Sequence, residues 1–584
     1  MIHGIRQSHS IAASVFRCLL VAALLGAMAE GRAPVKPASD GQGLKPILNY
    51  ISSGWDTLTR SMTECKSIVD PKIATAPVLY LPAGFVEPAS VKTLAASCNV
   101  RVEHLPMEIH RLGEIDASNF NPPGLLYLPE KYVVPGGRFN EMYGWDSYFI
   151  IRGLLQAGRV EGARGMVENF FFEVENYGAM LNANRTYYLT RSQPPFMSSM
   201  VVDVYEAMQK QPAHKDTPAD RAWLERAYAD LEKDYGMWTR DPHLAGDTGL
   251  SRYFDFGEGP PAEAVQDESG FYRKVAQYFF LHPGQADDYV VETAAAGAKQ
   301  PVAGSPYSLQ VCDVSMTMAR AECEKARQFK LSADYYKGDR SMRESGFDVS
   351  FRFGPFGSAT HHYAPVCLNS LLYKTEKDLE QISLWLGHNE DARKWNKHAE
   401  ERKKLITHYL WNGEQGLFFD FNTVTKQMSS YKYATTFYPL WAGLATAAQA
   451  KAVADNLKIF ERPGGIPMST EDTGTQWDLP YGWGNIEMLA IEGLRRYGYN
   501  ADADRISYEF LSTVAENFRR DRNIREKYNV VTRSSEAHVE LGYEMNVVGF
   551  GWTNAAFLEL LHALPKEMVD RLEKEQNQPL PAVK

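Results

Sequence analysis

Apolar residues recur at helical spacing through most of the second half of the chain. Thr217-Pro218 pairs an N-cap residue with proline at the first helical position, and Trp223, Ala227 and Leu231 follow at intervals of four. The same periodicity predicts helices over residues 376–386, 392–410, 439–457, 485–497, 502–518 and 552–564. A short helix is predicted over 56–72, and strand-like alternation is scarce. The pattern therefore predicts an all-α fold of stacked helical hairpins.

The loop composition favours one large domain. A chain of 584 residues has room for two or three domains, but no linker-like composition occurs between about residues 75 and 565. Residues 30–48 are rich in Pro, Gly and charge, which predicts a flexible segment. We therefore expect a single domain over 49–567, with an N-terminal arm, and a C-terminal tail over 568–584.

The first 29 residues have the pattern of an export signal. Arg6 and Arg17 precede or enter the apolar run Cys18–Leu25, and Ala27-Met28-Ala29 follows it. Cleavage is predicted after Ala29, which would place the protein in the periplasm or the medium. No other stretch approaches the roughly 20 apolar residues that a membrane helix needs, so no membrane partner is expected after signal removal.

Charge and cysteine content limit the possible partners and the possible cysteine chemistry. The formal net charge of −10, with no basic block, argues against a nucleic-acid partner. Without Cys18 the chain keeps five cysteines, an odd number with no metal-ligand spacing. A bridge between Cys65 and Cys98 is allowed by this count, but nothing in the sequence supports it.

The stretch PGGRFNEMYGWDSYFI, residues 135–150, has the composition of a sugar site. Pyranose rings stack their apolar faces on aromatic rings, and their hydroxyls need carboxylate and guanidinium partners. Arg138, Trp145 and Asp146 supply these groups. Taken alone, the stretch also fits a turn followed by an aromatic core helix from about Phe139.

A second motif, QWDLPYGW at residues 476–483, follows more than three hundred residues later. Together the two motifs resemble the PGGRFxExYxWDxY and QWDxPxGW signatures of the α,α-trehalase family, inverting enzymes of glycoside hydrolase family 37. The resemblance implies an (α/α)6 barrel with the active site at one end. It also implies hydrolysis of α,α-trehalose to two glucose molecules without a cofactor, and Trp477 of the second motif is expected to bind sugar.

Glycoside hydrolysis requires two carboxyl groups, and composition cannot select them among 72 acidic residues. The segment ESGFDVSFRF, residues 344–353, resembles the family's ESGWDFSSRW segment, which carries the general acid. The resemblance assigns that role to Asp348 and a sugar-binding position to Gly346. The alternative is that Asp348 only forms an i,i+4 ion pair with Arg352.

The second carboxylate comes from REKYNV, residues 525–530. This segment resembles the family's EKYDV, whose glutamate is the general base, so Glu526 is the candidate here. Asn529 replaces the family's aspartate and removes one neighbouring negative charge. The alternative for Glu526 is a charged turn at a helix end.

Further binding residues follow from the resemblance. NANRTYYLTRSQPP, residues 182–195, is similar to the family's NGNRxYYLxRSQPP, which implies sugar contacts from Asn182, Arg191, Ser192 and Gln193. PPAEAV, residues 260–265, keeps the glutamate of the family's PRPESY as Glu263 but lacks its arginine. GFGWTN, residues 549–554, matches a packing and lid element. The sugar-binding glutamate ahead of it is Glu544, with Glu540 as a competitor.

The remaining candidates for metal or acid–base chemistry are histidines. His361-His362 and His538 have no third ligand at a metal-binding spacing, so we interpret them as polar loop residues and expect no metal. Cys367 stands where the family has aspartate, in PVCLNS. A monomer is expected.

Three functions fit these residues. The first is an exported inverting trehalase. The second keeps the barrel but acts on another α-glucoside or uses phosphate in place of water. The third is a non-catalytic sugar-binding descendant, against which the retention of both Asp348 and Glu526 argues.

Overall fold

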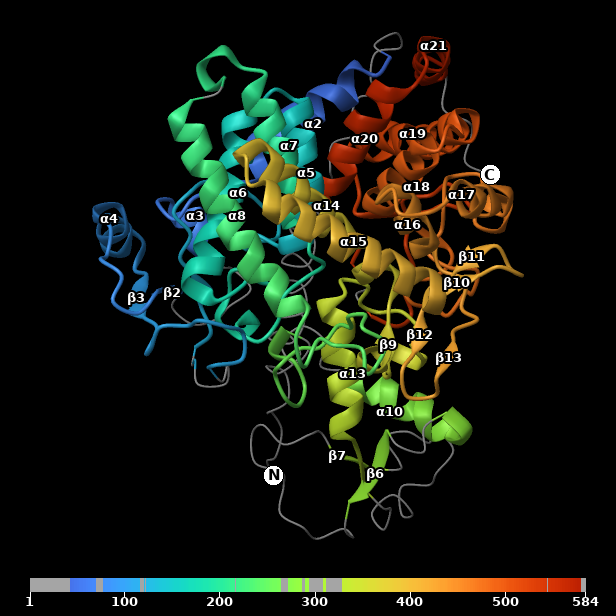
Figure 1. The fold of residues 1–584 in the computed structure, drawn as a ribbon, viewed down its shortest axis with the longest axis horizontal. Coiled ribbons are helices and arrows are strands. Elements are labelled where there is room, and N and C mark those ends of the chain that lie inside the picture. The colour runs from blue at the N-terminus through green and yellow to red at the C-terminus, as the bar shows by residue number, and fades with distance from the viewer. Residues whose placement is uncertain are drawn as a thin grey trace, which may run out of the picture.

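Six helices form a closed ring in the computed structural model, in which each packs against the next and the last returns to the first (Figure 1). The model describes residues 43–69, 77–115, 120, 122–215, 217–263, 271–285, 289–293, 308–310, 328–542 and 545–578. In order around the ring the helices are α5 (Gly144–Gln156), α7 (Met197–Gln209), α14 (Val366–Leu386), α16 (Tyr438–Trp441), α18 (Gly484–Arg496) and α20 (Gly551–Ala563).

A second layer of helices surrounds this ring. It consists of α2 (Lys45–Leu58), α6 (Val160–Tyr177), α8 (Pro218–Trp238), α15 (Asn389–Leu410), α17 (Ala447–Asp455) and α19 (Asn500–Asp521). For example, α6 packs against both α5 and α7, and α19 packs against both α18 and α20. Inner and outer helices alternate along the chain from α5 onward, which confirms the predicted all-α (α/α)6 barrel.

The helices begin where the sequence provides caps. Thr217 accepts a hydrogen bond from the backbone N–H of Asp220 at 3.1 Å at the start of α8, and Thr446 and Gln449 form a capping box at the start of α17. The predicted helix over 439–457 is divided into α16 and α17. Gly443 lies between them with φ +76°, a left-handed conformation that favours glycine.

The shorter helices cover the ends and sides of the barrel. They are α3 (Cys65–Ile68), α4 (Ala89–Cys98), α10 (Phe271–Leu281), α13 (Ala333–Glu344) and α21 (Lys566–Gln576), with 3-10 turns η2 (Thr186–Tyr188), η3 (Pro212–His214), η4 (Pro283–Gln285), η5 (Pro355–Gly357), η6 (Thr360–His362), η7 (Ala434–Phe437) and η8 (Leu457–Ile459).

The strands are short and lie in separate small sheets. β14 (Tyr481–Trp483) pairs antiparallel with β15 (Lys527–Asn529), and this pair places Trp483 opposite Lys527. The other sheets are β1 (Thr59–Arg60) with β5 (Tyr132–Val133), β2 (Val78–Leu81) with β3 (Arg101–His104) and β4 (Leu125–Leu126), β6 (Val290–Thr293) and β7 (Ser308–Gln310) with β8 (Gln328–Leu331), β9 (Tyr363–Ala364) and β13 (Gln427–Met428) with β12 (Phe421–Asn422), and β10 (Trp411–Asn412) with β11 (Leu417–Phe418).

Both ends of the barrel domain differ from the sequence-based boundaries. Helix α2 begins at Lys45, inside the segment 30–48, because Ile47, Ile51 and Trp55 form one buried face that packs on α20. The predicted continuous helix over 56–72 is wrong, since α2 ends at Leu58, a strand paired with β5 follows and only α3 is helical after it, while residues 70–72 lie outside the described residues. At the other end, residues expected in the tail from 568 belong to α21, which packs on α19.

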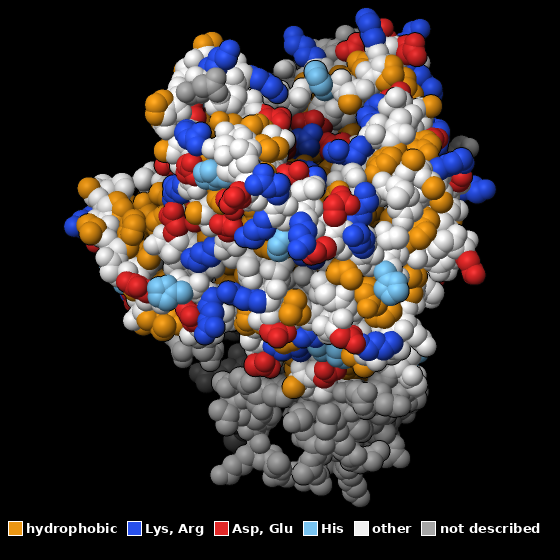
Figure 2. Space-filling model, in the orientation of Figure 1, with side chains coloured by type: hydrophobic (Ala, Val, Ile, Leu, Met, Phe, Trp, Pro, Cys, Tyr) orange, Lys and Arg blue, Asp and Glu red, His pale blue; other side chains and the backbone are white. Residues whose placement is uncertain are grey.

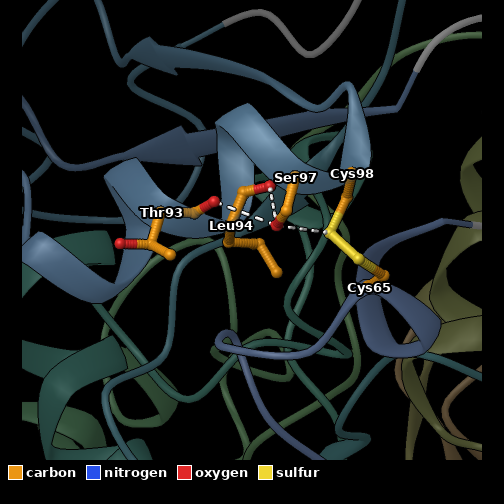
Figure 3. Close-up of a disulfide and its surroundings, with 5 residues drawn as sticks. All are labelled: Cys65, Thr93, Leu94, Ser97 and Cys98. Carbon is orange, nitrogen blue, oxygen red and sulfur yellow. Dashed lines mark hydrogen bonds between the residues drawn. A yellow bond between two sulfur atoms is a disulfide. The ribbon is translucent and has the colours of Figure 1, made fainter.

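A disulfide joins α3 to α4 (Figure 3). Cys65 and Cys98 have their Cα atoms 5.5 Å apart, within the usual range for a bridge. The number of cysteines in the sequence allowed this pairing, but nothing in the sequence supported it. Cys367 is free and buried.

The described surface carries charges of both signs. Figure 2 shows basic and acidic side chains interspersed over the face that carries α8, α14 and α15. In the described part of the chain, no helix combines the length and the apolar character required to cross a bilayer. Residues 1–42, which contain the expected export signal and its cleavage position after Ala29, lie outside the described residues.

A buried ion pair supports the segment that follows Asp348. The Arg352 guanidinium donates to both carboxylate oxygens of Asp420, at 2.8 and 2.6 Å, and both side chains are almost fully buried. Asp420 also accepts from the backbone N–H of Val366, the first residue of α14, at 2.9 Å. The alternative reading of Arg352 as an i,i+4 partner of Asp348 is wrong, because Arg352 pairs with Asp420 and no helix spans residues 348–352.

We predict that Arg352→Met lowers the free energy of unfolding by about 3 to 5 kcal/mol, because it leaves Asp420 buried without its cation. Urea denaturation checks this value. The double variant Arg352→Met/Asp420→Asn should lose less than the single variant, since it removes the uncompensated charge. Equal losses in the two variants would contradict the argument.

Candidate active site

A cavity of about 660 Å³ opens at one end of the barrel. It lies where the N-terminal ends of inner helices meet: Trp145 and Asp146 lie in the first turn of α5, Trp483 directly precedes α18, and Trp552 lies in the first turn of α20. Eleven of the residues predicted from the sequence line it, namely Arg138, Trp145, Asp146, Asn182, Arg191, Gln193, Glu263, Gly346, Asp348, Trp477 and Glu526. Residues separated by up to 388 positions therefore share one site.

Four tryptophans form an aromatic wall of the cavity. Trp477 stacks on Trp483 with ring centroids 3.7 Å apart and planes 3° apart. Trp145 packs at an angle against Trp477 and Trp552, with centroid distances of 5.7 and 5.8 Å. Pyranose rings stack on flat apolar surfaces of this kind.

Gly346 gives the backbone a close approach to this wall. Its φ is +76°, and a Cβ atom at this position would lie 2.8 Å from the Trp145 ring. A side chain at 346 would therefore displace the tryptophan as well as strain the backbone.

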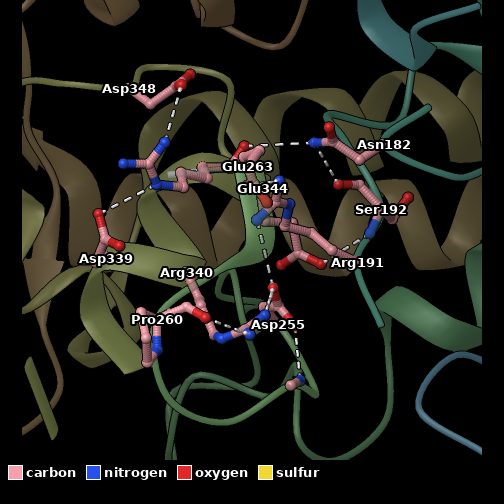
Figure 4. Close-up of polar contacts among 12 residues, drawn as sticks. Asn182, Arg191, Ser192, Asp255, Pro260, Glu263, Asp339, Arg340, Glu344 and Asp348 are labelled. Carbon is pink, nitrogen blue, oxygen red and sulfur yellow. Dashed lines mark hydrogen bonds and ion pairs between the residues drawn. The ribbon is translucent and has the colours of Figure 1, made fainter. Parts of the chain in front are cut away.

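Asp348 lies in the loop after α13. Its side chain is 23% exposed, so it is accessible from the cavity, and one carboxylate oxygen lies 3.9 Å from Nη1 of Arg343 (Figure 4). The backbone carbonyl of Asp348 accepts a hydrogen bond from Nε2 of Gln476 at 2.5 Å. These contacts hold the Asp348 loop against the second sequence motif.

Glu526 lies immediately before β15. Nζ of Lys527 donates to its carboxylate at 3.0 Å, and this lysine side chain is fully buried. The indole N–H of Trp552 and the hydroxyl of Thr553 both donate to the Glu526 backbone carbonyl, at 3.0 and 3.3 Å. The carboxylate and its backbone are thus fixed from separate sides.

Gln476 connects the two candidate catalytic segments. Its Nε2 donates to the Asp348 carbonyl, and its Oε1 accepts from Nζ of Lys527 at 3.0 Å. The same ammonium contacts Glu526 and lies 4.9 Å from the centre of the Trp483 ring. One amide and one ammonium therefore link the Asp348 loop to the Glu526 strand.

Asp146 lies close enough to Asp348 and Glu526 for their negative charges to act on its carboxyl group. Its pKa is raised well above the usual range, chiefly because burial disfavours the charged form, and the negative charges of Glu526 and Asp348 raise it further. Perturbed acids in a concave pocket are typical of functional sites.

Arg191 lines the cavity and forms a buried charge cluster with Glu263 and Asp255 (Figure 4). It pairs with Glu263, and Nη1 lies 3.5 Å from Asp255. The positive charge of Arg191 holds the pKa of Glu263 below its usual value against the effect of burial, and Arg340 with Arg191 does the same for Asp255. The guanidinium also lies over the Tyr188 ring, 4.9 Å from its centre.

Not every predicted binding residue reaches the cavity wall. Ser192 is buried behind it, where its hydroxyl donates to the carbonyl of Met180 at 2.6 Å. Gln193 accepts from the backbone N–H of Trp145 at 2.9 Å, so it also fixes the start of α5. Glu544 lies outside the described residues, and its competitor Glu540 is exposed and does not line the cavity.

Arg343 was missed by sequence reasoning. It lines the cavity at the end of α13, pairs with Asp339 at 3.2 Å and lies over the Phe271 ring. The 260–265 loop lacks the arginine of the family pattern, and Arg343 brings a guanidinium to the same cavity from another element. Its position beside the ESGFD segment, two residues before Ser345, was the available signal.

Comparison with known proteins agrees with this geometry. The trehalase family model matches residues 49–565. The chain belongs to the trehalase family. It is 36% identical over 563 residues to the cytosolic neutral trehalase of Saccharomyces cerevisiae, covering 86% of this chain and 69% of that protein, and 34% identical to a probable trehalase of Eremothecium gossypii, covering 86% and 70%.

A solved structure gives the same result. The neutral trehalase from Saccharomyces cerevisiae superposes with a TM-score of 0.73 at 32% identity, covering 92% of this chain and 96% of that one. This trehalase is therefore a glycoside hydrolase with an (α/α)6 barrel that acts on trehalose, and the prediction of family, fold and enzyme class is confirmed.

The expected location requires correction. The relatives from Saccharomyces cerevisiae and Neurospora crassa are named cytosolic neutral trehalases, which contradicts the expectation of a signal peptide and a periplasmic or secreted enzyme. That expectation depended on the apolar run 18–25 and the small residues after it. A short apolar run shows only that the segment is hydrophobic, which is not sufficient to predict export.

We predict that Asp146→Asn lowers activity but raises the stability of this trehalase at neutral pH. A carboxyl whose pKa is raised on folding binds its proton more tightly in the folded state, so its contribution to stability is full below the unfolded pKa and is lost as pH rises through the folded pKa. The stability advantage of the variant should therefore be present at neutral pH and disappear toward about pH 4. Thermal unfolding from pH 4 to 8 tests this, and an advantage that grows at low pH would contradict it.

Proposed function

We propose that the enzyme hydrolyses trehalose with inversion, with Asp348 as general acid and Glu526 as general base. The observation that carries this assignment is that two carboxylates from separate loops line one cavity and are linked through Gln476 and Lys527. Hydrolysis by inversion needs such a pair on opposite sides of the scissile bond.

The proton transfers follow from these roles. Asp348 gives its proton to the glycosidic oxygen as the bond from that oxygen to the anomeric carbon breaks. Glu526 takes a proton from a water that attacks the same carbon from the opposite face. Room for this water requires carboxyl groups roughly 6.5 to 9.5 Å apart. The ring that is attacked leaves as β-glucose, and the leaving ring is released as α-glucose.

The remaining cavity residues support binding. The tryptophan wall offers an apolar face for one ring, while Arg138, Arg191, Asn182 and Arg343 bring hydrogen-bond donors to the cavity. Asp146 and Glu263 offer carboxyl oxygens. The pocket therefore combines the stacking surface and the polar groups that a disaccharide requires.

Lys527 positions the general base in this mechanism. Its ammonium is fully buried, with its described contacts to Glu526, Gln476, the Met545 carbonyl at 3.4 Å and the Trp483 ring. Because a buried ammonium must keep its partners, it orients Glu526 while Gln476 connects it to the Asp348 loop.

The reaction's stereochemistry tests the proposed mechanism. We expect early NMR spectra to show equal amounts of α- and β-glucose from trehalose. Asp348→Asn should abolish trehalose hydrolysis but retain activity on a glucosyl fluoride, whose leaving group needs no proton, whereas Glu526→Gln should lose both. Early appearance of α-glucose alone would overturn the assignment, and so would a fluoride activity that Glu526→Gln retains. A requirement for phosphate would indicate phosphorolysis instead.

Loss of the Lys527 contact should mainly reduce turnover. We expect Lys527→Met to lower kcat by at least about tenfold with little change in KM, since the ammonium orients the base and does not line the cavity. Lys458→Met, an exposed lysine in η8, is the control and should behave as wild type. Gln476→Glu keeps an acceptor for Lys527 but loses the N–H donor to the Asp348 carbonyl. We therefore expect it to lower kcat by less than Lys527→Met does. A change in KM alone would contradict a positioning role.

A further inference from the structure

Two adjacent histidines and one aspartate meet at the start of α13. Nε2 of His361 lies 3.0 Å from an Asp334 carboxylate oxygen, and Nε2 of His362 lies 3.8 Å from the same oxygen. One ligand atom from each of the three residues lies within 4.8 Å of the others. The sequence shows the two histidines without a third ligand, and the fold brings Asp334 to them from 27 residues earlier.

We propose that Asp334, His361 and His362 bind a divalent transition metal of the zinc type. Zinc accepts imidazole nitrogen and carboxylate oxygen at about 2.0 to 2.2 Å, which sets neighbouring ligand atoms in a tetrahedron about 3.3 Å apart. The spacings to the Asp334 oxygen lie on either side of that value. Side-chain rotation alone can therefore close the three groups on one ion.

The exposure of the three residues leaves room for water ligands. The His361 side chain is 6% exposed, whereas those of His362 and Asp334 are 25% and 45% exposed. The cluster therefore has one closed side and one side open to solvent. Three protein ligands with an open position are common for zinc, and water supplies the rest.

The ligand atoms favour a nitrogen-binding metal over calcium or magnesium. Arg252 donates to the His361 carbonyl at 2.8 Å, and its positive charge opposes every cation at the cluster alike, so selectivity depends on the ligand atoms. Asp334 is the single carboxylate among the three ligands. Hard cations need several oxygen ligands, whereas two imidazoles supply the donors that zinc, nickel and copper prefer.

The hydrogen bonds made by the other ring nitrogens of the histidines affect how tightly a metal binds. Nδ1 of His361 is buried and has no hydrogen-bond partner among the described residues. Metal-bound histidines usually donate this second N–H to a carboxylate or carbonyl, and losing such a partner weakens binding roughly 10- to 100-fold. We therefore expect binding in the micromolar range and not the tight binding of structural zinc sites.

A metal here would join two elements near the active site. Asp334 lies in the first turn of α13, whose last turn carries Arg343, and the histidines lie in η6, after the segment from Asp348 to Arg352. The ion would fasten η6 to α13 without contacting the cavity. It should therefore change stability and leave turnover unaltered.

The test uses tag-free, chelator-treated full-length enzyme titrated with ZnCl2 by calorimetry, and with CoCl2 by visible absorption. We expect one equivalent to bind and to raise the melting temperature. Asp334→Asn and His362→Gln should each weaken binding at least tenfold, abolish the thermal shift and retain trehalose hydrolysis. His408→Gln, an exposed histidine on α15, is the matched control and should bind as wild type.

Each outcome decides the proposal. Loss of binding in both ligand variants, with the control unaffected and no thermal shift from CaCl2, supports the site. Absence of stoichiometric binding to wild type would overturn it. Zinc binding that survives both substitutions would place the metal elsewhere in the chain and overturn it equally. Retained hydrolysis in the ligand variants excludes misfolding as the reason for a lost signal.

Discussion

The structure depends on closure of the inner ring, in which the last barrel helix, α20, packs on the first, α5. The approach is close at Gly153, where a Cβ atom would come within 2.8 Å of the Ala555 Cβ and 2.9 Å of the Trp55 ring. Because interiors are packed to crystal-like density, a side chain here would separate α5 from α20. The same two helices carry Trp145 and Trp552, so barrel closure also assembles the aromatic wall.

Closure explains how one cavity collects residues from the whole chain. The inner helices present their N-terminal ends to the same end of the barrel, and the preceding loops carry the polar groups. The β14–β15 pair then fixes the position of Glu526 along the second motif. The register of the two strands places Lys527, the residue after Glu526, opposite Trp483. Short strands thus align the candidate catalytic segments on a helical scaffold.

Much of this could be predicted from sequence because the barrel is built from local periodicity. The predicted helix over 392–410 corresponds to α15, and the cap at Thr217 is present, since both depend on neighbouring residues. The two-residue strands carry no such periodicity, and their partners are distant in sequence. Asp334 was missed for the same reason: its significance comes from neighbours that only the fold brings near it.

Buried carboxylates around the site lower the stability of the fold unless a cation pairs with them, and only some of them have such a partner among the described residues. Arg191 and Arg340 together balance the charges of Glu263 and Asp255, and Arg352 balances Asp420. Asp146 shares the cavity with Asp348 and Glu526, and its pKa is raised well above the usual range by burial and by the charges of these two groups. Burying an acid without a cation costs free energy. Within the cavity this cost falls on Asp146, beside the tryptophan wall and the two catalytic candidates, so the proposed site carries an electrostatic penalty that its paired carboxylates avoid.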